Sequence, residues 1–566
     1  MEFNKSCLLN VRDNPPWKNH GDIYYQDLVV IYIDLNNKAR AQMIVNNLVS
    51  PYISLYNVIN CLNKIIEFRK EKGCKTIHKT VVWVNGLHIV QGYFNCFKFN
   101  EDYFTNNKGK KLWRLYNNEF EIRNFNIISN SEDLKSLKKS CGFNEKLSGA
   151  DIMKSFLLLR GKQGLKGWAK INYSFAYCAN KLFFKGLENL KYKNEKSIPN
   201  LENYRLIQRC NKSGLLDYMK EYKNVLLNEV TGWDMSSAYP AQFINQKMPI
   251  GKFMPMPADN KSLKMAIDND WSFLVEIKTK DKLIDIARNA CEEKDDGYYY
   301  VMTDWDVKRY KLLGVKVKGT IINLRVCKEK DYLDYEFRKR IVEYYEDKQN
   351  NKGVNNEMYF EKKTTLDAIW GKGLQEFNPE SEEQLRRRYY RNHNRYLLPQ
   401  WSLWGAAATR YEMAKAIKEI IDNDEDDFVA CDTDGIKFRG EHNEYFEKRN
   451  KEIMEKNAAA GFPDCEIGTW KFEGCFENFI QFGYKQYAFS LNGELTCKFA
   501  GCSKDAWKNY FKDKSIEECF ELLGSEDIMI PAASKKYNWV NGNLLVVNSG
   551  YKPGDENLET YQVKAV

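Results

Sequence analysis

Two aspartates separated by a single residue, Asp432 and Asp434, lie in the segment 431–435, Cys-Asp-Thr-Asp-Gly. An apolar run precedes this segment and Ile-Lys-Phe follows it, which predicts a β-hairpin with both carboxylates at its turn. Side chains two residues apart share one face of a strand, and on a turn they can converge on one cation. Carboxylates this close repel each other unless a cation or a proton intervenes, and Mg²⁺ prefers such oxygen ligands. Many solvated turns also hold Asp-x-Asp, so the pair indicates catalysis only with a third carboxylate from another strand.

A third carboxylate is available at Asp234, in the segment 230–240, Val-Thr-Gly-Trp-Asp-Met-Ser-Ser-Ala-Tyr-Pro. We expect a strand over residues 224–230, with Asp234 standing where that strand ends. The small residues and Pro240 that follow predict a turn into a helix from about Ala241, and a helix N-terminus attracts phosphate. The alternative is an aspartate that caps a helix, but this does not account for Tyr239 directly before the proline.

A cation and an indole ring lie seven residues apart in the segment 362–372, at Lys363 and Trp370. On a helix they share one face about two turns apart, which suits a triphosphate and a stacked base. Gly371 would end the helix or permit close approach of nucleic acid. The alternative is an ordinary amphipathic helix in which Lys363 pairs with Asp367 four residues on.

Three segments in this order resemble motifs of the family B DNA polymerases, specifically the protein-primed polymerases of small phages: DMSSAYP at 234–240, KTTLDAIWGK at 363–372 and ACDTDGI at 430–436. The family motifs read roughly Asp-x-x-Ser-Leu-Tyr-Pro, Lys-x-x-x-Asn-x-x-Tyr-Gly-Lys and Tyr-x-Asp-Thr-Asp-Ser. Lys485 and Tyr487 resemble the family's Lys-x-Tyr, residues 498–504 the start of its thumb, and residues 299–306 its insertion that docks a priming protein. The resemblance covers nearly the whole chain and is most specific over residues 220–505.

The resemblance implies phosphoryl transfer assisted by two Mg²⁺ ions, with Mn²⁺ as a substitute. Asp234 and Asp434 would bridge the ions, the Met235 carbonyl would complete the metal shell, and Asp432 would also be needed for catalysis. Tyr239 would sit under the sugar and clash with a ribose 2′-hydroxyl, so that dNTPs are favoured over NTPs.

The resemblance also implies contacts to nucleotide and DNA. The nucleotide would be bound by Met235, Tyr239, Lys348, Lys363, Asp367 and Trp370. The DNA would be bound by Gly371, Lys372, Arg386, Arg387, Arg388, Thr433, Lys485 and Tyr487. This chain departs from the family pattern by carrying Asp367 for Asn, Trp370 for Tyr and Gly435 for Ser, while Cys431 reads as an inert core thiol. None of these departures removes a metal ligand.

The N-terminal part of the family is a 3′–5′ exonuclease that uses four carboxylates. A match of its motifs to this sequence puts Leu8, Asn10, Ile89 and Phe125 at the carboxylate positions. A rival first motif at residues 33–36 also lacks the acidic partner. Because a site without carboxylates cannot hold two divalent ions, we expect a folded domain without proofreading. The family's linker signature survives at most as residues 211–214, Asn-Lys-Ser-Gly.

Residues 385–391 mix cations with tyrosines, as phosphate contact and base stacking require. They lie where the family inserts a hairpin around the downstream template, and a solvated charged hairpin is an equally good interpretation. The insertion is short, which puts strand displacement and high processivity in doubt.

Composition agrees with this interpretation. The 566 residues are enough for several domains, and 86 Lys and Arg against 77 Asp and Glu give a net charge of +9, a mild excess that suits nucleic acid. Fifteen cysteines without metal-ligand spacing, and no apolar run able to span a membrane, predict free thiols and a cytoplasmic protein of a bacterium or a phage-infected host cell.

We therefore expect a multidomain α/β and α+β chain. Residues 1–205 would form a ribonuclease-H-like, exonuclease-like domain and residues 206–566 a right-hand polymerase, with its palm at about 206–330 and 400–495, fingers at 331–375, template hairpin at 376–400 and thumb at 500–566. The predicted helices of the fingers are 336–348 and 357–372, a further helix over 411–421 precedes the catalytic hairpin, and small strands lie near 538–547.

Three functions remain open. The first is a DNA polymerase that extends a primer, or a hydroxyl of a terminal protein, on a DNA template with dNTPs, acting as a monomer without a membrane. The second is a repurposed polymerase that makes untemplated or unprimed DNA, for example in defence. The third is a non-catalytic nucleic-acid-binding scaffold, which retention of all the palm carboxylates disfavours.

Overall fold

The computed structural model describes residues 29–33, 40–45, 48–71, 80–84, 87, 90–91, 98–106, 109–117, 120–124, 183–187, 189–190, 194–211, 214–283, 291–374, 379–391, 397–422, 427–500, 502, 504–525, 528–540, 543–551 and 563–565. The chain divides into two compact units, one of residues 1–185 and 346–368 and the other of residues 186–345 and 369–566. Each unit is described by itself. The predicted fold class, a multidomain α/β and α+β chain, is confirmed.

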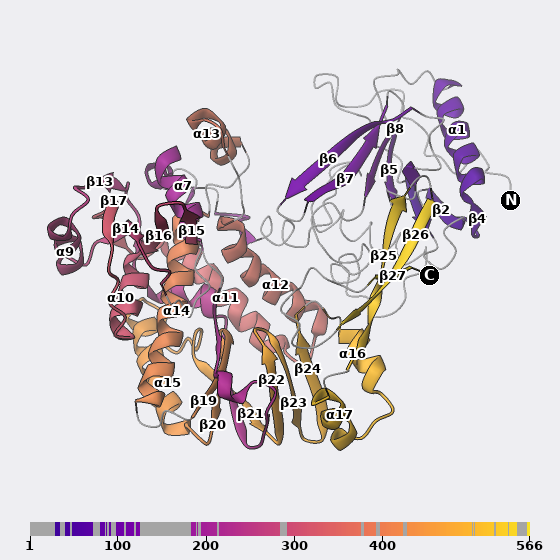
Figure 1. Cartoon of the computed structure of the whole chain (residues 1–566). Coiled ribbons are helices and arrows are strands. Elements are labelled where there is room, and N and C mark those ends of the chain that lie inside the picture. Colours follow the sequence, from indigo (N-terminus) through magenta and orange to yellow (C-terminus); the bar gives the residue numbers. More distant parts are fainter. Residues whose placement is uncertain are drawn as a thin grey trace. The chain divides into compact units, whose positions relative to one another are not determined.

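The first unit is built on a mixed eight-stranded sheet with the order β3-β2-β1-β5-β8-β7-β6, in which β4 also pairs with β2 (Figure 1). Its strands are β1 (Val29–Ile33), β2 (Arg40–Val45), β3 (Leu48–Val49), β4 (Ile53–Ser54), β5 (Thr80–Val84), β6 (Asn100–Asn106), β7 (Gly109–Tyr116) and β8 (Phe120–Asn124). The central strands β1, β5 and β8 are parallel, and the flanking pairs are antiparallel. Every residue of β1, Val-Val-Ile-Tyr-Ile, is buried, as expected of a parallel strand covered on both faces. Helix α1 (Leu55–Glu71) packs Val58 and Leu62 into this core.

The second unit centres on an antiparallel five-stranded sheet that carries all three candidate aspartates. Its order is β21-β11-β20-β19-β9. The strands are β9 (Leu215–Tyr218), β11 (Val230–Met235), β19 (Phe428–Thr433), β20 (Gly435–Arg439) and β21 (Trp470–Phe476). We call it the palm sheet. The predicted hairpin is thereby confirmed, since β19 and β20 are adjacent antiparallel strands.

Two long helices, α14 (Pro399–Ile421) and α15 (Asn443–Ala459), cover one face of the palm sheet (Figure 1). Helix α14 contributes Met413, Ile417 and Ile420 to the shared core, and α15 contributes Phe446. The predicted helix over 411–421 is only the second half of α14. Its first half, which includes Gly-Ala-Ala-Ala, is buried almost throughout. That half gives no amphipathic signal because both of its faces are packed.

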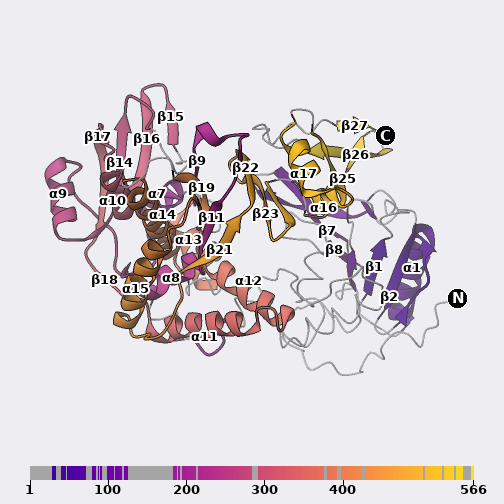
Figure 2. The same ribbon diagram turned by 90° about the horizontal axis from the view of Figure 1, so that it is seen from below.

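A second antiparallel sheet, with the order β13-β17-β14-β16-β15, follows the first aspartate in sequence. Its strands are β13 (Met254–Pro255), β14 (Ser272–Thr279), β15 (Cys291–Lys294), β16 (Gly297–Thr303) and β17 (Thr320–Cys327). Helices α9 (Asn260–Asp268) and α10 (Asp304–Leu312) pack against it (Figure 2). Helix α10 begins with a capping box, because the Thr303 hydroxyl accepts from the Asp306 N–H and the Asp306 carboxylate accepts from the Thr303 N–H.

A third antiparallel sheet, β10-β22-β23-β24, packs against two short helices. Its strands are β10 (Leu226–Leu227), β22 (Asn478–Gly483), β23 (Gln486–Leu491) and β24 (Glu494–Phe499). The helices are α16 (Lys504–Phe511) and α17 (Ile516–Leu523). The strands predicted near 538–547 belong to a longer hairpin of β25 (Ile530–Val540) and β26 (Asn543–Tyr551), to which β27 (Val563–Ala565) pairs. A short pair, β12 (Met248–Pro249) with β18 (Lys330–Asp331), completes the sheets of the described residues.

The predicted helical pair is confirmed as α11 (Tyr335–Asn351) and α12 (Asn356–Gly373). An ion pair of 2.8 Å between Lys362 Nζ and Asp347 Oδ2 joins the two helices. The predicted hairpin at 376–400 is wrong where the structure describes it, since residues 382–391 form helix α13 (Glu382–Arg391). The segment Glu-Glu-Gln-Leu-Arg-Arg-Arg consists of strong helix formers, and Glu382 pairs with Arg386 one turn later at 3.4 Å.

Two further expectations around Asp234 need correction. The strand predicted over 224–230 is instead the two-residue β10, and β11 begins at Val230 and carries Asp234 itself. The helix expected from about Ala241 begins at Ala238, as α8 (Ala238–Asn245), because Ser237 turns the chain through a left-handed conformation at φ 53°. Proline is tolerated in the first turn of a helix, so Pro240 did not mark the boundary. Among the described helices, none is long and apolar enough to cross a bilayer.

Candidate active site

The pairing register of the palm sheet gathers the three aspartates. Gly435 of β20 lies opposite Asp234 on one side and opposite Asp432 on the other. Residues directly opposite in an antiparallel sheet share a face, so Asp234 and Asp432 stand on the same face with only a glycine between them. Asp434 is the turn residue just before Gly435, and its carbonyl accepts a hydrogen bond of 2.8 Å from the Met235 N–H. We call Asp234, Asp432 and Asp434 the carboxylate row.

The turn between strands β19 and β20 is tight. Thr433 adopts a left-handed backbone with φ 66°, and the Asp434 N–H donates to the Asp432 carbonyl at 2.7 Å. Gly214 lies against this turn, since a Cβ at that position would come within 2.7 Å of Thr433 Cγ2. Gly214 is therefore a close backbone neighbour of Thr433, a predicted DNA contact.

Lysines neutralise part of this negative charge. Lys485 Nζ lies 3.3 Å from Asp432 Oδ1, and the Thr433 hydroxyl donates to the same oxygen at 3.1 Å. Both charged groups are partly exposed, so this ion pair is weak and easily exchanged for other partners. A second lysine, Lys437, is buried beside the row and donates to Glu473 Oε2 at 2.6 Å.

Two tyrosine hydroxyls are affected by the same carboxylates. Burial raises the pKa of Tyr487, and the negative charges of Asp432, Glu473, Asp234 and Asp434 raise it further. Burial also raises the pKa of Tyr239, followed by the charge of Asp434. Both tyrosines therefore stay neutral in the neutral pH range and can only donate or accept hydrogen bonds there.

Tyr239 and Trp370 form a flat aromatic platform. Their rings stack with centroids 4.2 Å apart and planes 9° apart. The indole Nε1 of Trp370 donates to the Ser402 carbonyl of α14 at 2.8 Å, which fixes the plane of the ring. A tyrosine in place of Trp370 has no N–H at this position, so this anchor depends on the departure from the family pattern.

The other predicted nucleotide contacts lie on α11 and α12. Lys348 is half-buried near the end of α11, and Lys363 and Asp367 are exposed on α12 four residues apart. These three belong to the unit of residues 1–185 and 346–368, whereas Trp370 and the aspartates belong to the other unit. Lys363 and Asp367 share helix α12 as predicted, but the approach of all three residues to the carboxylate row stays a prediction.

The remaining predicted positions divide into two groups. Gly371 and Lys372 lie in the last turn of α12, and Arg386, Arg387 and Arg388 lie on α13. Leu8, Asn10, Ile89 and Phe125, expected at degenerate exonuclease positions, lie outside the described residues.

The donors of the row fit Mg²⁺ in kind. They are hard carboxylate oxygens. Asp234 Oδ1 lies beside Gly435, 3.5 Å from the position that a Cβ on this glycine would occupy. Within the described residues, no three His, Cys, Asp or Glu side chains converge as a complete metal site. Mg²⁺ is usually held by one or two carboxylates together with water and substrate phosphates instead of an all-protein cage.

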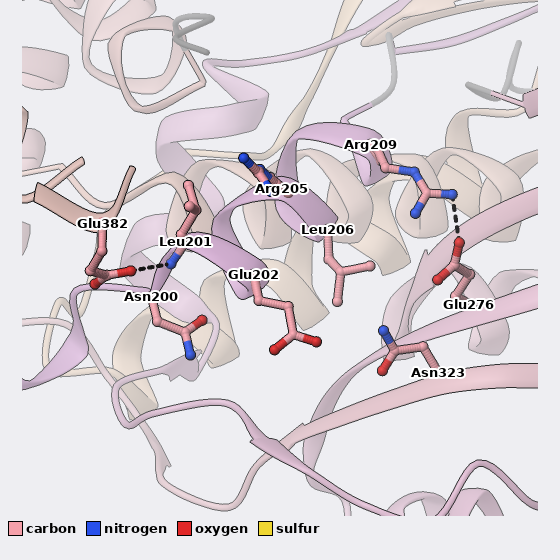
Figure 3. A pocket seen from close by; sticks show the side chains of 9 residues that line it. All are labelled: Asn200, Leu201, Glu202, Arg205, Leu206, Arg209, Glu276, Asn323 and Glu382. Carbon is pink, nitrogen blue, oxygen red and sulfur yellow. Dashed lines mark hydrogen bonds and ion pairs between the residues drawn. The ribbon is translucent and has the colours of Figure 1, made fainter. Parts of the chain in front are cut away.

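A pocket of about 470 Å³ lies apart from the row, against helix α7 (Leu201–Cys210) (Figure 3). Two of its charged side chains have partners within the protein, because Arg209 contacts Glu276 at 2.5 Å and Glu382 accepts from the Leu201 N–H at 2.8 Å. It contains none of the predicted site residues.

No protein-family model and no curated protein matches the sequence. Solved structures do match the fold. The structure of Phi29 DNA polymerase complexed with primer-template DNA and incoming nucleotide substrates is similar with a TM-score of 0.62 and 12% identity over 94% of this chain and 100% of that one. The binary complex of Phi29 DNA polymerase with primer-template DNA gives 0.60 and 13% over 93% and 100%. The chain therefore has the fold of a phage-type DNA polymerase, with a ribonuclease-H-like sheet and a palm, fingers and thumb.

The sequence analysis missed the pair of Lys437 and Glu473. The signal was present in β20, Gly-Ile-Lys-Phe-Arg, where strand alternation puts Ile436 and Phe438 in the helix-covered core and Lys437 on the opposite face with the carboxylates. Glu473 could not be found in this way, because it lies at an irregularity of β21.

Proposed function

We propose that this chain is a DNA-directed DNA polymerase that adds dNTPs to a primer hydroxyl by nucleotidyl transfer assisted by two Mg²⁺ ions. The observation that carries the proposal is the register of the palm sheet, in which Gly435 separates Asp234 from Asp432 on one face. The order of the motifs and the likeness to Phi29 DNA polymerase support it.

Asp234 and Asp434 would hold the two metal ions together with the Met235 carbonyl. When bound, the ions would lower the pKa of the primer hydroxyl and neutralise charge on the triphosphate. The chain's own contribution is to fix the carboxylates on rigid neighbouring strands, so that little reorganisation is needed when the substrates bind. Asp432 would orient the row through its contacts with Thr433 and Lys485.

The stacked rings of Tyr239 and Trp370 would form the floor under the incoming sugar and base. A fixed ring at this place leaves no room for a 2′-hydroxyl, which would favour dNTPs over NTPs. Lys348 of α11 and Lys363 of α12 would bind the triphosphate, and Asp367 lies four residues after Lys363 on α12. Lys485, Tyr487 and Thr433 would contact the primer strand. Lys372 in the last turn of α12 and the three arginines of α13, Arg386, Arg387 and Arg388, would contact template phosphates.

We further propose that synthesis starts from a hydroxyl of a terminal protein and that the N-terminal unit lacks proofreading. Both follow from the sequence resemblance, the second from Leu8, Asn10, Ile89 and Phe125 at the four carboxylate positions.

Primer extension on a labelled primer–template, with Mg²⁺ and dNTPs, tests the proposal. Extension should require template, and Asp434→Asn should reduce it to background while gel-shift affinity for the same DNA is retained. Asp513→Asn, at an exposed position beyond α16, is the matched control and should extend normally. Undiminished extension by Asp434→Asn refutes the two-metal assignment, and extension without template favours the repurposed polymerase.

Incubating a labelled single strand with Mg²⁺ and the full chain tests the first, N-terminal unit separately. We expect no 3′ shortening. Steady 3′ trimming that survives Asp434→Asn would overturn the assignment of the degenerate positions.

A further inference from the structure

Lys437 is a buried lysine in the palm sheet, whereas most lysine side chains lie on the protein surface. It lies two residues after Gly435 on β20 and therefore points to the face of the carboxylate row. Its neighbours across the sheet are Gly232 on β11 and Ala430 on β19. Because those residues have little or no side chain, they leave space for the long lysine side chain to lie along the sheet.

The ammonium of Lys437 is buried and forms an ion pair with Glu473. Only 7% of the side chain is exposed, and Nζ lies 2.6 Å from Glu473 Oε2 and 5.7 Å from the centre of the Phe476 ring. Glu473 reaches this position through a β-bulge: Gly232 pairs with Gly474 and Trp233 pairs with Phe472, so Glu473 is the extra residue of β21. A bulge re-aims a side chain, and here it aims a carboxylate at the lysine.

The same ammonium lies close to the carboxylate row. Lys437 Nζ and Asp234 Oδ1 each lie 3.5 Å from the point where a Cβ on Gly435 would stand. They are therefore within about 7 Å of each other, less than one Debye length at physiological salt. Glu473 would be a fourth carboxylate beside the row if Lys437 did not hold and neutralise it.

We propose that Lys437 is a positioning residue that sequesters Glu473 and so sets the affinity of the carboxylate row for divalent cations. The inference rests on the proposed function and assigns a regulatory role to a residue that the nucleotidyl-transfer mechanism does not use. With the pair intact, its net charge is zero and the metal site is Asp234, Asp432 and Asp434. Without the ammonium, the site gains one negative charge and a competing ligand that is not in place for the reaction.

Removing the charge of Lys437 and removing the charge of Glu473 should have opposite effects on the affinity for a divalent cation, and the two effects should cancel when both are removed. Lys437→Met should tighten binding of a divalent cation by about threefold or more, from one unit charge acting on a divalent ion at this range in a screened, partly aqueous site. Glu473→Gln should weaken it by a similar factor, because it leaves the ammonium uncompensated. The double variant Lys437→Met/Glu473→Gln should bind within about twofold of the original chain, since the net charge is restored.

The test is a titration of the full chain with Mn²⁺ alone, followed by electron paramagnetic resonance of the free ion, without DNA or nucleotide. Lys512→Met, exposed at the end of α16, is the matched control and should leave the affinity unchanged. The melting temperature of each variant is measured in parallel. Should Lys437→Met fail to fold, Glu473→Gln and the double variant still test the inference, because a buried pair replaced as a unit by neutral groups is usually tolerated.

Three outcomes are informative. An unchanged Mn²⁺ affinity in folded Lys437→Met or Glu473→Gln overturns the inference and leaves the proposed function intact. The expected pattern of affinities in a chain that does not extend primers supports the inference and overturns the proposed function. Absence of Mn²⁺ binding by the original chain and all variants overturns the inference, whereas the proposed function is decided separately by primer extension.

Discussion

Asp304, the first residue of α10, is a buried carboxyl group with too few partners. Its exposed fraction is 2%, and Oδ1 accepts a hydrogen bond of 2.8 Å from Trp404 Nε1 on α14. Within the described residues, Oδ2 has no hydrogen-bond partner. Burial raises the pKa of Asp304 to about 6, although the charges of Lys330 and Lys308 and the Trp404 hydrogen bond oppose the shift. We predict that Asp304→Asn stabilises the chain increasingly as the pH rises.

The sign and size follow from linkage. The folded chain holds the Asp304 proton more tightly than the unfolded chain, for which the ordinary pKa is 3.8. The stabilisation that comes from this tighter proton binding at Asp304 is therefore complete below pH 3.8 and is lost as the pH rises through about 6. At pH 8 the ionised group costs about 3 kcal/mol, and at pH 4 about 0.5 kcal/mol. Asparagine carries no charge at either pH, so the gain from Asp304→Asn should grow by about 2.5 kcal/mol between them.

Urea unfolding at pH 4 and pH 8, followed by tryptophan fluorescence, measures this difference. Any constant cost of the amide, such as an altered bond to Trp404, cancels because it is the same at both pH values. Asp268→Asn, exposed on α9 of the same unit, gives the background to subtract. A gain that is equal at both pH values, or larger at pH 4, refutes the assignment of a raised pKa to Asp304.

Three further predictions concern the packing around the row. Asp306→Asn leaves the fully buried Arg410 without the carboxylate that it contacts at 3.1 Å and should lower the unfolding free energy by about 3–5 kcal/mol in urea melts. Trp370→Phe keeps a stacking ring but loses the 2.8 Å hydrogen bond to α14; it should cost about 1 kcal/mol and raise the KM for dNTPs severalfold more than it changes kcat in primer extension. Gly232→Ala puts a Cβ 2.6 Å from Phe476 Cζ and should lower the thermal midpoint, at a cost of about 1–3 kcal/mol. Replacing Phe476 by a smaller apolar residue in the same chain should recover part of this loss.

The sequence predicts the parts of this site that depend on local pattern. The hairpin of β19 and β20 follows from an apolar run, a turn and a second apolar run, and α12 follows from helical spacing, whereas α11 is expected only from the family resemblance. Only half of the long α14 is predicted because its buried first half has no polar face, and α13 replaces the hairpin that the resemblance implies at that place. The register that puts Gly435 between Asp234 and Asp432 lies beyond local pattern, since it depends on the pairing of strands about 200 residues apart.

Small residues in the palm sheet leave room for several charged side chains on one face of the sheet. Gly232 and Ala430 give Lys437 room to lie along the sheet, Gly435 leaves the gap between two aspartates open, and a side chain at Gly214 would strike the turn at Thr433. A Cβ at Gly232 would press on Phe476 and on Glu473 Oε2, which would lie 2.6 and 3.2 Å away. In a site where the charges lie within one Debye length of one another, a resulting shift of the Glu473 carboxylate changes how strongly a cation is held. At Gly435 a Cβ would lie 3.5 Å from both Lys437 Nζ and Asp234 Oδ1, so the side chain at this position sets how closely the two charges are packed.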